Sequence, residues 1–280
     1  MPGDKQDCVS IFGKNGYDGT TTIGERGGAM QIILSPAKNM RRAVREDITL
    51  RKPLFRQQTE QLAAVLRGYS HFELETLMKI NPKLALGAYL NFQDFDWDHV
   101  GLPSLLAYDG LVFKNIEPEN FTTAQYQYAD EHVWVLSAFY GMLRPCDGIM
   151  PYRLEMICPL NIDGKNLYQF WGDGVYQQLF AAGEPVLNLA SAEYSKLVTP
   201  YLKEPDRLIT IDFRTMRQGK LRTVTTSAKM ARGQMTAWIV RNGLDRPQEV
   251  QQFTWDGYTY APQLSDERTY VFIQQQTGGM

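Results

Sequence analysis

The sequence is poor in cysteine and histidine, and these scarcities exclude several kinds of site. Its 280 residues include three cysteines, Cys8, Cys146 and Cys158, and three scattered histidines. An odd number of cysteines without C-x-x-C spacing argues against a disulfide framework and against a closed zinc site, which uses four paired ligands. We therefore expect no metal and no other cofactor. A reducing compartment follows, most simply the cytoplasm.

Long apolar runs and a dominant charge are missing as well. No apolar run approaches the roughly 20 residues that span a bilayer, and the N-terminus lacks the pattern of a signal peptide, so we expect no membrane partner. The 29 Lys and Arg residues nearly balance the 31 Asp and Glu residues. This balance argues against a uniformly basic nucleic-acid-binding protein but allows a local basic cleft. The 44% apolar content is typical of a globular protein and excludes disorder of the whole chain.

The first 29 residues differ in character from the rest. They are rich in glycine and show no amphipathic period, which is typical of a flexible extension. Their glycines match neither dinucleotide-binding nor P-loop spacing. We interpret residues 1–29 as a tag or a misassigned start, and residues 30–280 as one domain whose folded part ends near Gln275. Deletion of residues 1–29 should leave folding intact.

Helical and strand-like patterns alternate irregularly along the domain. An apolar run opens it at residues 31–34, and a capping box of Ser70 with Glu73 and an Asn81-Pro82 pair each mark the start of a helix. The other predicted elements are helices at 59–68, 166–182 and 229–241, strands at 106–113, 132–138, 184–191 and 269–274, a hairpin at 208–226 and an Asp256-Gly257 turn. Because strands and helices do not alternate strictly, the pattern predicts a single α+β domain.

Five short segments concentrate polar chemistry where strands or helices begin or end. They are LSPAKN with Lys38, the 137–156 segment with Arg144, Asp147, Arg153 and Glu155, LYQFWGDG with Trp171, NLASAEYSK with Asn188, Ser191, Glu193 and Lys196, and SAKMARGQM with Lys229 and Arg232. Ends of strands are where a rigid scaffold presents functional side chains. Cations near helix N-termini oppose the macrodipole, which indicates an anionic partner such as phosphate.

Each of these segments also has a purely structural interpretation. Arg153 and Glu155 would form an ion pair on one strand face. Ser191 and Ser227 would cap helices, Trp171 would belong to the core, and Lys229 and Arg232 would form a solvated face. The sequence alone leaves both interpretations open.

Taken in order, the five segments resemble the bacterial peroxide stress protein YaaA family. The resemblance extends from Met30 to about Ile273. Cys146 and Met230 depart from the family pattern, which usually has Leu and a second Lys at these positions. The resemblance implies a cytoplasmic peroxide stress protein that limits free intracellular iron and binds double-stranded DNA through a positively charged cleft. It also implies a largely antiparallel sheet core flanked by small helical subdomains, including a helix-hairpin-helix-like element.

The DNA hypothesis predicts particular residues. We expect the hairpin element at residues 73–91, where Lys79 and Lys83 would contact adjacent phosphates without base readout; a plain helical hairpin is the alternative. For the phosphate-binding cleft we expect Lys38, Arg144, Arg153, Lys196, Lys229 and Arg232.

An enzyme acting on a nucleotide or another small anionic metabolite is the competing hypothesis. Glu155 or Glu193 would be the general base, and Lys38 the proton donor or electrostatic clamp. The two hypotheses differ in geometry, since an enzyme needs these residues in one pocket and a duplex needs an open groove. Direct iron binding has the least support, because clustered E-x-x-H ligands are missing.

Overall fold

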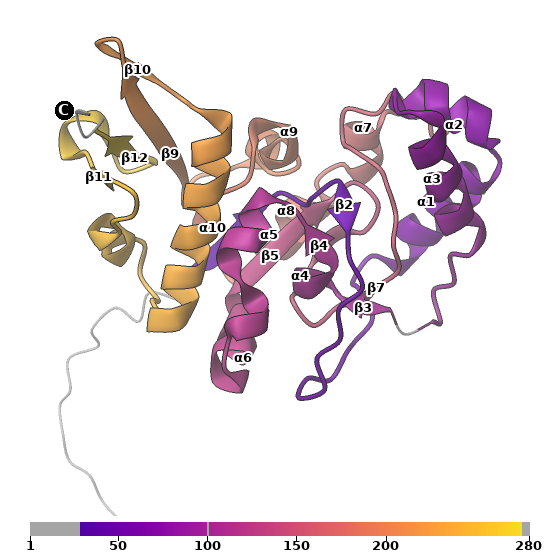
Figure 1. Ribbon diagram of the computed structural model, residues 1–280, viewed down its shortest axis with the longest axis horizontal. Coiled ribbons are helices and arrows are strands. Elements are labelled where there is room, and N and C mark those ends of the chain that lie inside the picture. Colours follow the sequence, from indigo (N-terminus) through magenta and orange to yellow (C-terminus); the bar gives the residue numbers. More distant parts are fainter. Residues whose placement is uncertain (1–28, 100, 276–280) are drawn as a thin grey trace, which may run out of the picture.

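The computed structural model describes residues 29–99 and 101–275, and its centre is an eight-stranded mixed sheet (Figure 1). The strands are β1 (Gln31–Leu34), β5 (Val133–Ser137), β6 (Gly141–Leu143), β8 (Val186–Asn188), β9 (Leu208–Arg217), β10 (Lys220–Arg222), β11 (Tyr258–Tyr260) and β12 (Thr269–Gln274). Their order is β11-β12-β9-β8-β1-β5-β6, and β10 pairs with β9. Four neighbouring pairs, from β12 across to β5, are parallel.

The α+β class is confirmed, but the expected largely antiparallel core is wrong. Within the central sheet, antiparallel pairing is confined to the contacts made by β6, β10 and β11, which lie at the two edges or on the hairpin. Every residue of β1, β5 and β8 is buried. Continuous apolar runs of this kind are typical of parallel strands that are covered on both faces. Of the hairpin predicted at 208–226, only β10 lies at the margin, because β9 is an interior strand between β12 and β8.

The order of the strands creates a switch point between β1 and β8. The chain places β5 and β6 on one side of β1, and then places β8, β9 and β12 on the other side. Connections leaving β1 and β8 therefore diverge. In open parallel sheets, the carboxyl ends of strands at such a point border a crevice where ligands bind.

The longest helix, α10 (Thr225–Asn242), packs against β9, α5 (Leu111–Ile116) and α6 (Thr123–His132). Gly233 allows the close approach of α10 to α5. A Cβ atom at this position would lie 2.3 Å from the carbonyl oxygen of Val112. No side chain larger than hydrogen fits there without moving a helix.

A helical group, α1 (Arg56–Arg67), α2 (His71–Met78) and α3 (Pro82–Gln93), lies at the other end of the molecule from β11 and β12 (Figure 1). The predicted capping box of Ser70 and Glu73 starts α2. Asn81 caps α3 by accepting the Leu84 N–H at 3.0 Å, with Pro82 in the first turn. Both predicted helix starts are confirmed. Helices α2 and α3 form a helical hairpin, but a helix-hairpin-helix DNA-binding geometry is not confirmed.

Two element predictions need correction. The run at 106–113 is not a strand; it contains α4 (Ser104–Ala107), the two-residue strand β4 (Tyr108–Asp109) and the start of α5. Periodicity cannot separate a short buried helix from a strand in such a run. The expected helix at 166–182 is two helices, α7 (Leu167–Trp171) and α8 (Gly174–Leu179), separated at Gly172, whose φ is +52°.

The remaining predicted elements match the structure. Strands β1, β5, β8 and β12, the β9–β10 hairpin and helices α1 and α10 all lie within or across their predicted ranges. The short strands β2 (Asn39–Met40) and β4 pair with each other, as do β3 (Leu102–Pro103) and β7 (Gly148–Ile149). Helix α9 (Ala192–Ser195) follows β8. The predicted extension, residues 1–29, lies outside the described part of the chain except for its last residue, Ala29.

Candidate functional site

A cavity of about 460 Å³ lies at the switch point, which we call the switch-point pocket. Its walls come from five segments that are distant in sequence: residues 35–39 after β1, 109–113 around the start of α5, 152–155, 189–194 after β8, and one face of α10. This volume falls within the range of small-molecule sites. Four of the five polar segments singled out in the sequence contribute to it.

Direct hydrogen bonds join the carboxyl ends of β1 and β8. The Ser35 hydroxyl accepts the Ser191 backbone N–H at 2.8 Å and donates to the Ser191 hydroxyl at 3.1 Å. The Leu189 N–H donates to the Ile33 carbonyl at 3.0 Å. Ser191 does occupy the N-cap position of α9, but its side chain makes no capping hydrogen bond. Both serines therefore fix the floor of the pocket.

Lys38 organises one wall of the pocket. Its ammonium pairs with the Glu155 carboxylate at 2.6 Å, and its carbonyl accepts from Arg153 Nη1 at 3.2 Å. The expected ion pair between Arg153 and Glu155 does not form. Both residues nevertheless line the pocket, as do their neighbours Tyr152 and Leu154. Arg153 Nε is buried and has no hydrogen-bond partner.

One face of α10 supplies further cations. Thr225, Lys229 and Arg232 line the pocket, and their spacing of four and three residues places them on one helix face. Val224, at the N-cap position, provides no side-chain cap, and Ser227 lies inside the helix rather than at its cap. The first-turn N–H groups of α10 therefore lack side-chain acceptors, a situation that favours a bound anion.

Arg232 is mostly buried, and its Nε atom has no hydrogen-bond partner. Burial lowers the pKa of Arg232, while the negative charge of Asp212 partly opposes this effect. None of the ion pairs among the described residues involves Lys229 or Arg232. A buried charged donor without a partner is costly, so an anionic ligand at this position would lower the energy of the folded protein.

Glu193 is the second carboxylate of the pocket. Burial raises the pKa of Glu193, and the nearby charge of Glu155 acts in the same direction. The Ile157 N–H donates to Glu193 Oε1 at 3.4 Å, and the Tyr168 hydroxyl donates to the Glu193 carbonyl at 3.0 Å. Tyr168 of the LYQFWGDG segment therefore holds the backbone of Glu193 in place. A carboxyl group with a raised pKa holds a proton more readily than an ordinary glutamate, which suits a general acid or base.

A chain of hydroxyl groups runs from the pocket into the core. The hydroxyl of Tyr152, which lines the pocket, is 2.8 Å from both the Tyr108 and the Ser137 hydroxyls. Ser137 Oγ also accepts the N–H groups of Phe139 and Tyr140. Because both of its acceptor positions are occupied, Ser137 must donate to Tyr152. Burial raises the pKa of Tyr152 to about 12, so its hydroxyl is neutral at physiological pH.

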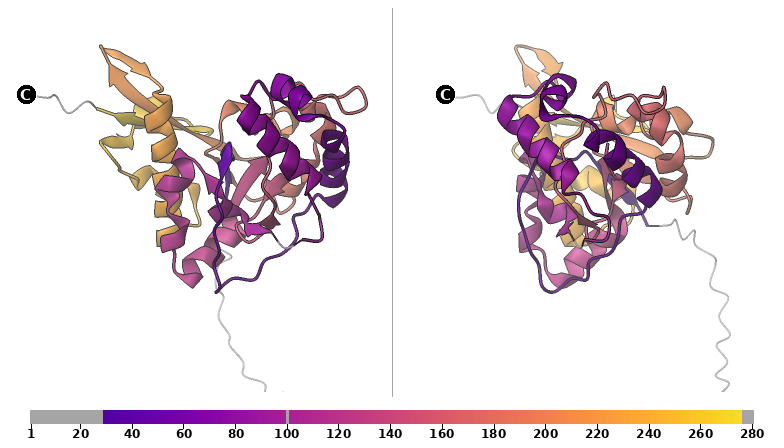
Figure 2. Two further views of the ribbon diagram at one scale, coloured as in Figure 1. Left: turned by 45° about the vertical axis from the view of Figure 1, so that its right-hand side comes forward. Right: turned by 90° about the vertical axis from the view of Figure 1, so that its right-hand side faces the viewer.

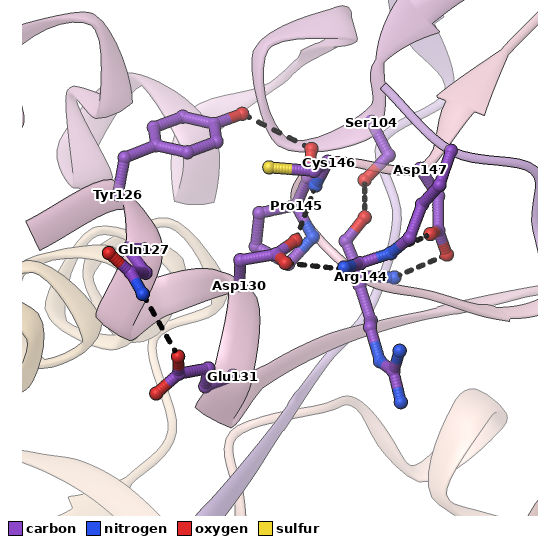
Figure 3. Close-up of polar contacts among 10 residues, drawn as sticks. Ser104, Tyr126, Gln127, Asp130, Glu131, Arg144, Pro145, Cys146 and Asp147 are labelled. Atoms are coloured by element: carbon purple, nitrogen blue, oxygen red, sulfur yellow. Dashed lines mark hydrogen bonds and ion pairs between the residues drawn. The ribbon is translucent and has the colours of Figure 1, made fainter. Parts of the chain in front are cut away.

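Arg144 lies at the opposite end of the sheet from the pocket. It follows β6, which is antiparallel to β5, and its guanidinium lies 4.7 Å from the centre of the Trp134 ring. Trp134 Nε1 in turn donates to Gln31, the first residue of β1. Figure 3 shows the Arg144 side chain pointing away from Asp130 and Asp147, while its backbone N–H donates to Asp147 at 2.8 Å. Arg144 therefore does not line the switch-point pocket with the other predicted cations.

Three other predicted cations also lie outside the switch-point pocket. Lys196 and Lys83 are exposed and do not line it. Lys79, at the C-terminal end of α2, borders a smaller neighbouring hollow instead. Trp171 belongs to the core, as its structural interpretation predicted, and donates to the Ala138 carbonyl at 3.0 Å.

Sequence reasoning missed the contribution of residues 109–113 and of Thr225. Asp109 and Gly110 were placed inside a strand, although an Asp-Gly pair is a turn signal. A second missed signal is the absence of acidic residues from 213 to 244, a stretch that contains seven Lys and Arg residues. It supplies the cationic face of α10 and the β9–β10 hairpin.

Two absences among the described residues bear on the kind of site. No group of three or more His, Cys, Asp or Glu side chains in residues 29–99 and 101–275 is placed to hold a metal ion. Within the same ranges, no helix combines the length and the apolar character needed to cross a membrane.

The fold and the pocket define an α+β protein with a polar, cation-lined cavity at the switch point of a mainly parallel sheet. The sequence model of the family described as peroxide stress protein YaaA matches residues 30–264. The chain is 37% identical over 247 residues to a UPF0246 protein of Clostridioides difficile, covering 88% of this chain and 100% of that one. It is 42% identical over 244 residues to a UPF0246 protein of Lactobacillus delbrueckii subsp. bulgaricus, covering 87% and 98%. The chain therefore belongs to the peroxide stress protein YaaA family.

Proposed function

We propose that this protein acts in the peroxide stress response by binding, in the switch-point pocket, a phosphate-bearing ligand of about nucleotide size. The observation that carries the proposal is the pair of buried guanidinium nitrogens without partners, Nε of Arg153 and Nε of Arg232, in one cavity. Folding has left two charged donors unsatisfied at the place where α10 presents its uncapped first turn. The oxyanion groups of one bound ligand would satisfy them.

The rest of the pocket supports a ligand that also has an apolar ring. The lining also includes apolar residues, namely Val112, Phe113, Leu154 and Leu189. We refer to them together as the apolar wall. Small-molecule sites typically combine an apolar wall with a few polar groups that fix orientation. A nucleotide has both parts, a phosphate for α10 and a ring for the apolar wall.

We infer that the pocket is also equipped for proton transfer, which keeps the enzyme hypothesis open. Glu193 has a raised pKa, and Glu155 is held by Lys38 at 2.6 Å. Neighbouring carboxyl groups whose environments differ in this way are a common arrangement for an acid and a base. In this proposal, Glu193 exchanges the proton and the Lys38–Glu155 pair orients the ligand.

The proposal is tested by thermal melting and calorimetric titration with inorganic phosphate and the four ribonucleoside monophosphates. We expect at least one nucleotide to raise the melting temperature of the wild type, as binding to the folded state requires. The shift should disappear in Arg232→Met and persist in Lys196→Ala, an exposed cation outside the pocket. The absence of any shift at millimolar ligand, or equal shifts in both variants, would reject the pocket as a phosphate site.

Double-stranded DNA is a second candidate ligand, and a specific surface favours it. The exposed residues Arg217, Lys220 and Arg222 lie on the β9–β10 hairpin, which projects from the body of the protein in both views of Figure 2. The hairpin leads into α10, and α10 begins on the same side of the molecule as α2 (Figure 1). We propose that duplex contacts involve this hairpin rather than the turn at Lys79 and Lys83. The iron-limiting role of the family would follow from ligand or DNA binding, not from a metal site among the described residues.

A gel-shift series at increasing salt tests the DNA candidate. Each phosphate neutralised contributes about −0.9 to the slope of log K against log salt, so three hairpin contacts contribute about −2.7. The triple variant Arg217→Ala, Lys220→Ala, Arg222→Ala should reduce the slope by that amount, whereas Lys79→Ala with Lys83→Ala should not. A slope near zero for the wild type would eliminate duplex binding of this kind.

A further inference from the structure

A second hollow lies beside the switch-point pocket and has no role in the function proposed above. It has a volume of about 210 Å³ and is lined by the end of α2, by residues 153–155 and by residues 157–159; we call it the side hollow. The two cavities share Arg153, Leu154 and Glu155 as lining residues. They are therefore neighbours on either side of one short segment.

The walls of the side hollow are mainly apolar. Leu77, Met78, Ile157 and Pro159 contribute apolar surface, and the charged residues of the lining are Lys79, Arg153 and Glu155, of which Glu155 is paired with Lys38. Ile157, which lines this hollow, is 68% exposed and offers its aliphatic side chain to a ligand. The hollow has room for about seven water molecules at liquid density. That space suits one ring system and is too small for a second complete nucleotide.

Arg153 stands between the two cavities with one edge of its guanidinium unsatisfied. Nη1 is held by the Lys38 carbonyl at 3.2 Å, whereas Nε is buried without a partner. Lys79 is held in the left-handed region, with φ 52°, at the C-cap of α2. None of the ion pairs among the described residues involves Lys79 or Arg153. A single anionic group between the two cavities would satisfy Arg153 and attract Lys79.

We propose that the ligand is a dinucleotide unit, with its second base in the side hollow and its linking phosphodiester beside Arg153 and Lys79. This inference rests on the proposed function, because the first nucleotide must occupy the switch-point pocket. In this arrangement the terminal phosphate lies at α10 and Arg232, the first ring lies on the apolar wall, and the second ring lies against Ile157. A phosphodiester link puts one phosphate on each side of the first nucleoside, one for α10 and Arg232 and one for Arg153 and Lys79, whereas the charges of a diphosphate would lie together.

The test compares 5′-phosphorylated thymidine mononucleotide with the 5′-phosphorylated thymidine dinucleotide by calorimetric titration. We expect the dinucleotide to bind the wild type about ten-fold tighter, the gain of roughly one charge-assisted hydrogen bond. Lys79→Ala should remove that gain and leave mononucleotide affinity unchanged. Ile157→Ser should also weaken only the dinucleotide. Both positions are exposed, and melting curves verify that each variant is folded.

Lys83→Ala is the matched control. Lys83 is the other exposed lysine of the helical hairpin and does not line the side hollow. We therefore expect the Lys83→Ala variant to bind both probes with the affinity of the wild type. Equal losses in Lys79→Ala and Lys83→Ala would overturn the proposal in favour of backbone contacts by the hairpin. Equal affinities of the wild type for the two probes would overturn it as well.

Two further arms separate the remaining outcomes. If neither probe binds, the dinucleotide proposal fails, and if no ribonucleoside monophosphate binds either, the proposed phosphate function fails with it; if the mononucleotide binds and the dinucleotide gains nothing, only the side hollow fails. A twelve-nucleotide single strand identifies the source of the unit. If the twelve-nucleotide strand binds no tighter than the dinucleotide, the natural ligand is a free dinucleotide or the end of a strand. If the strand binds tighter and Lys79→Ala still weakens its binding, the natural ligand is an internal dinucleotide step of a strand.

Discussion

Replacing Arg232 by methionine should make the protein more stable and at the same time abolish binding of a phosphate ligand. Arg232 is mostly buried, Nε has no partner, and burial lowers its pKa, so its charge is held at a cost in the folded state. An unsatisfied buried donor of a charged group costs about 1–3 kcal/mol. Methionine has a similar length, no charge and nearly the same helix propensity as arginine. We therefore expect the free energy of unfolding to rise by about 1–3 kcal/mol.

Urea unfolding followed by circular dichroism measures this change, and thermal melting provides a second readout. For a domain of this size, each kcal/mol corresponds to about 2–4 °C in melting temperature. Lys229→Met is the matched control, because Lys229 lies one turn away on the same face but is exposed. Its effect should stay within about 0.5 kcal/mol.

The ligand reverses the order of the two proteins. A nucleotide at one thousand times its Kd adds about 4.1 kcal/mol to the stability of a protein that binds it, and this gain is available only to the wild type. If Arg232→Met were instead less stable than the wild type without ligand, the guanidinium would have an unrecognised favourable role. The physical basis of the phosphate proposal would then be wrong.

Three other substitutions test the surroundings of the site. Gly233→Ala places a Cβ atom 2.3 Å from the Val112 carbonyl oxygen; we expect a loss of about 1–3 kcal/mol in urea unfolding, and an unchanged midpoint would contradict the close helix contact. Tyr152→Phe removes the hydroxyl between two buried hydroxyl groups and should lower stability by about 1–3 kcal/mol in the same assay; a neutral effect would mean that these groups find other partners. Burial raises the pKa of Asp147 to about 6 from its ordinary value near 3.8, so the folded state binds the extra proton and stability should fall as pH rises from about 4 to about 6. Asp147→Asn should flatten that dependence, and an unchanged slope between wild type and variant would refute the assignment.

Local chemistry allowed several features to be predicted from the sequence. The caps of α2 and α3 depend on residues three positions apart, which interact whatever the rest of the chain does. The spacing of Thr225, Lys229 and Arg232 places them on one face of any helix. The positions of Lys38 and Glu193 after apolar strands likewise indicated a functional edge of the sheet.

Long-range pairing decided what those local patterns could not. Lys38 and Glu155 are 117 positions apart, and their contact at 2.6 Å exists only because β1 and the 152–155 segment meet at one edge of the sheet. Arg144 and Arg153 are close in sequence, yet Arg144 lies beside Trp134 at the opposite edge. A cation is placed by the strand end that carries it, and the direction of that strand is set by pairing with distant strands.

The amino-acid composition, which has few cysteines and histidines and almost no net charge, determined the broad class of protein. It also determined which kinds of site could be excluded. It did not determine whether the cations lie in a groove or in a pocket, because net charge contains no positional information. The order β9-β8-β1-β5 decided that question. Parallel strands bring their carboxyl ends to one edge, and this geometry gathers Arg153, Lys229 and Arg232 from separate segments around one cavity.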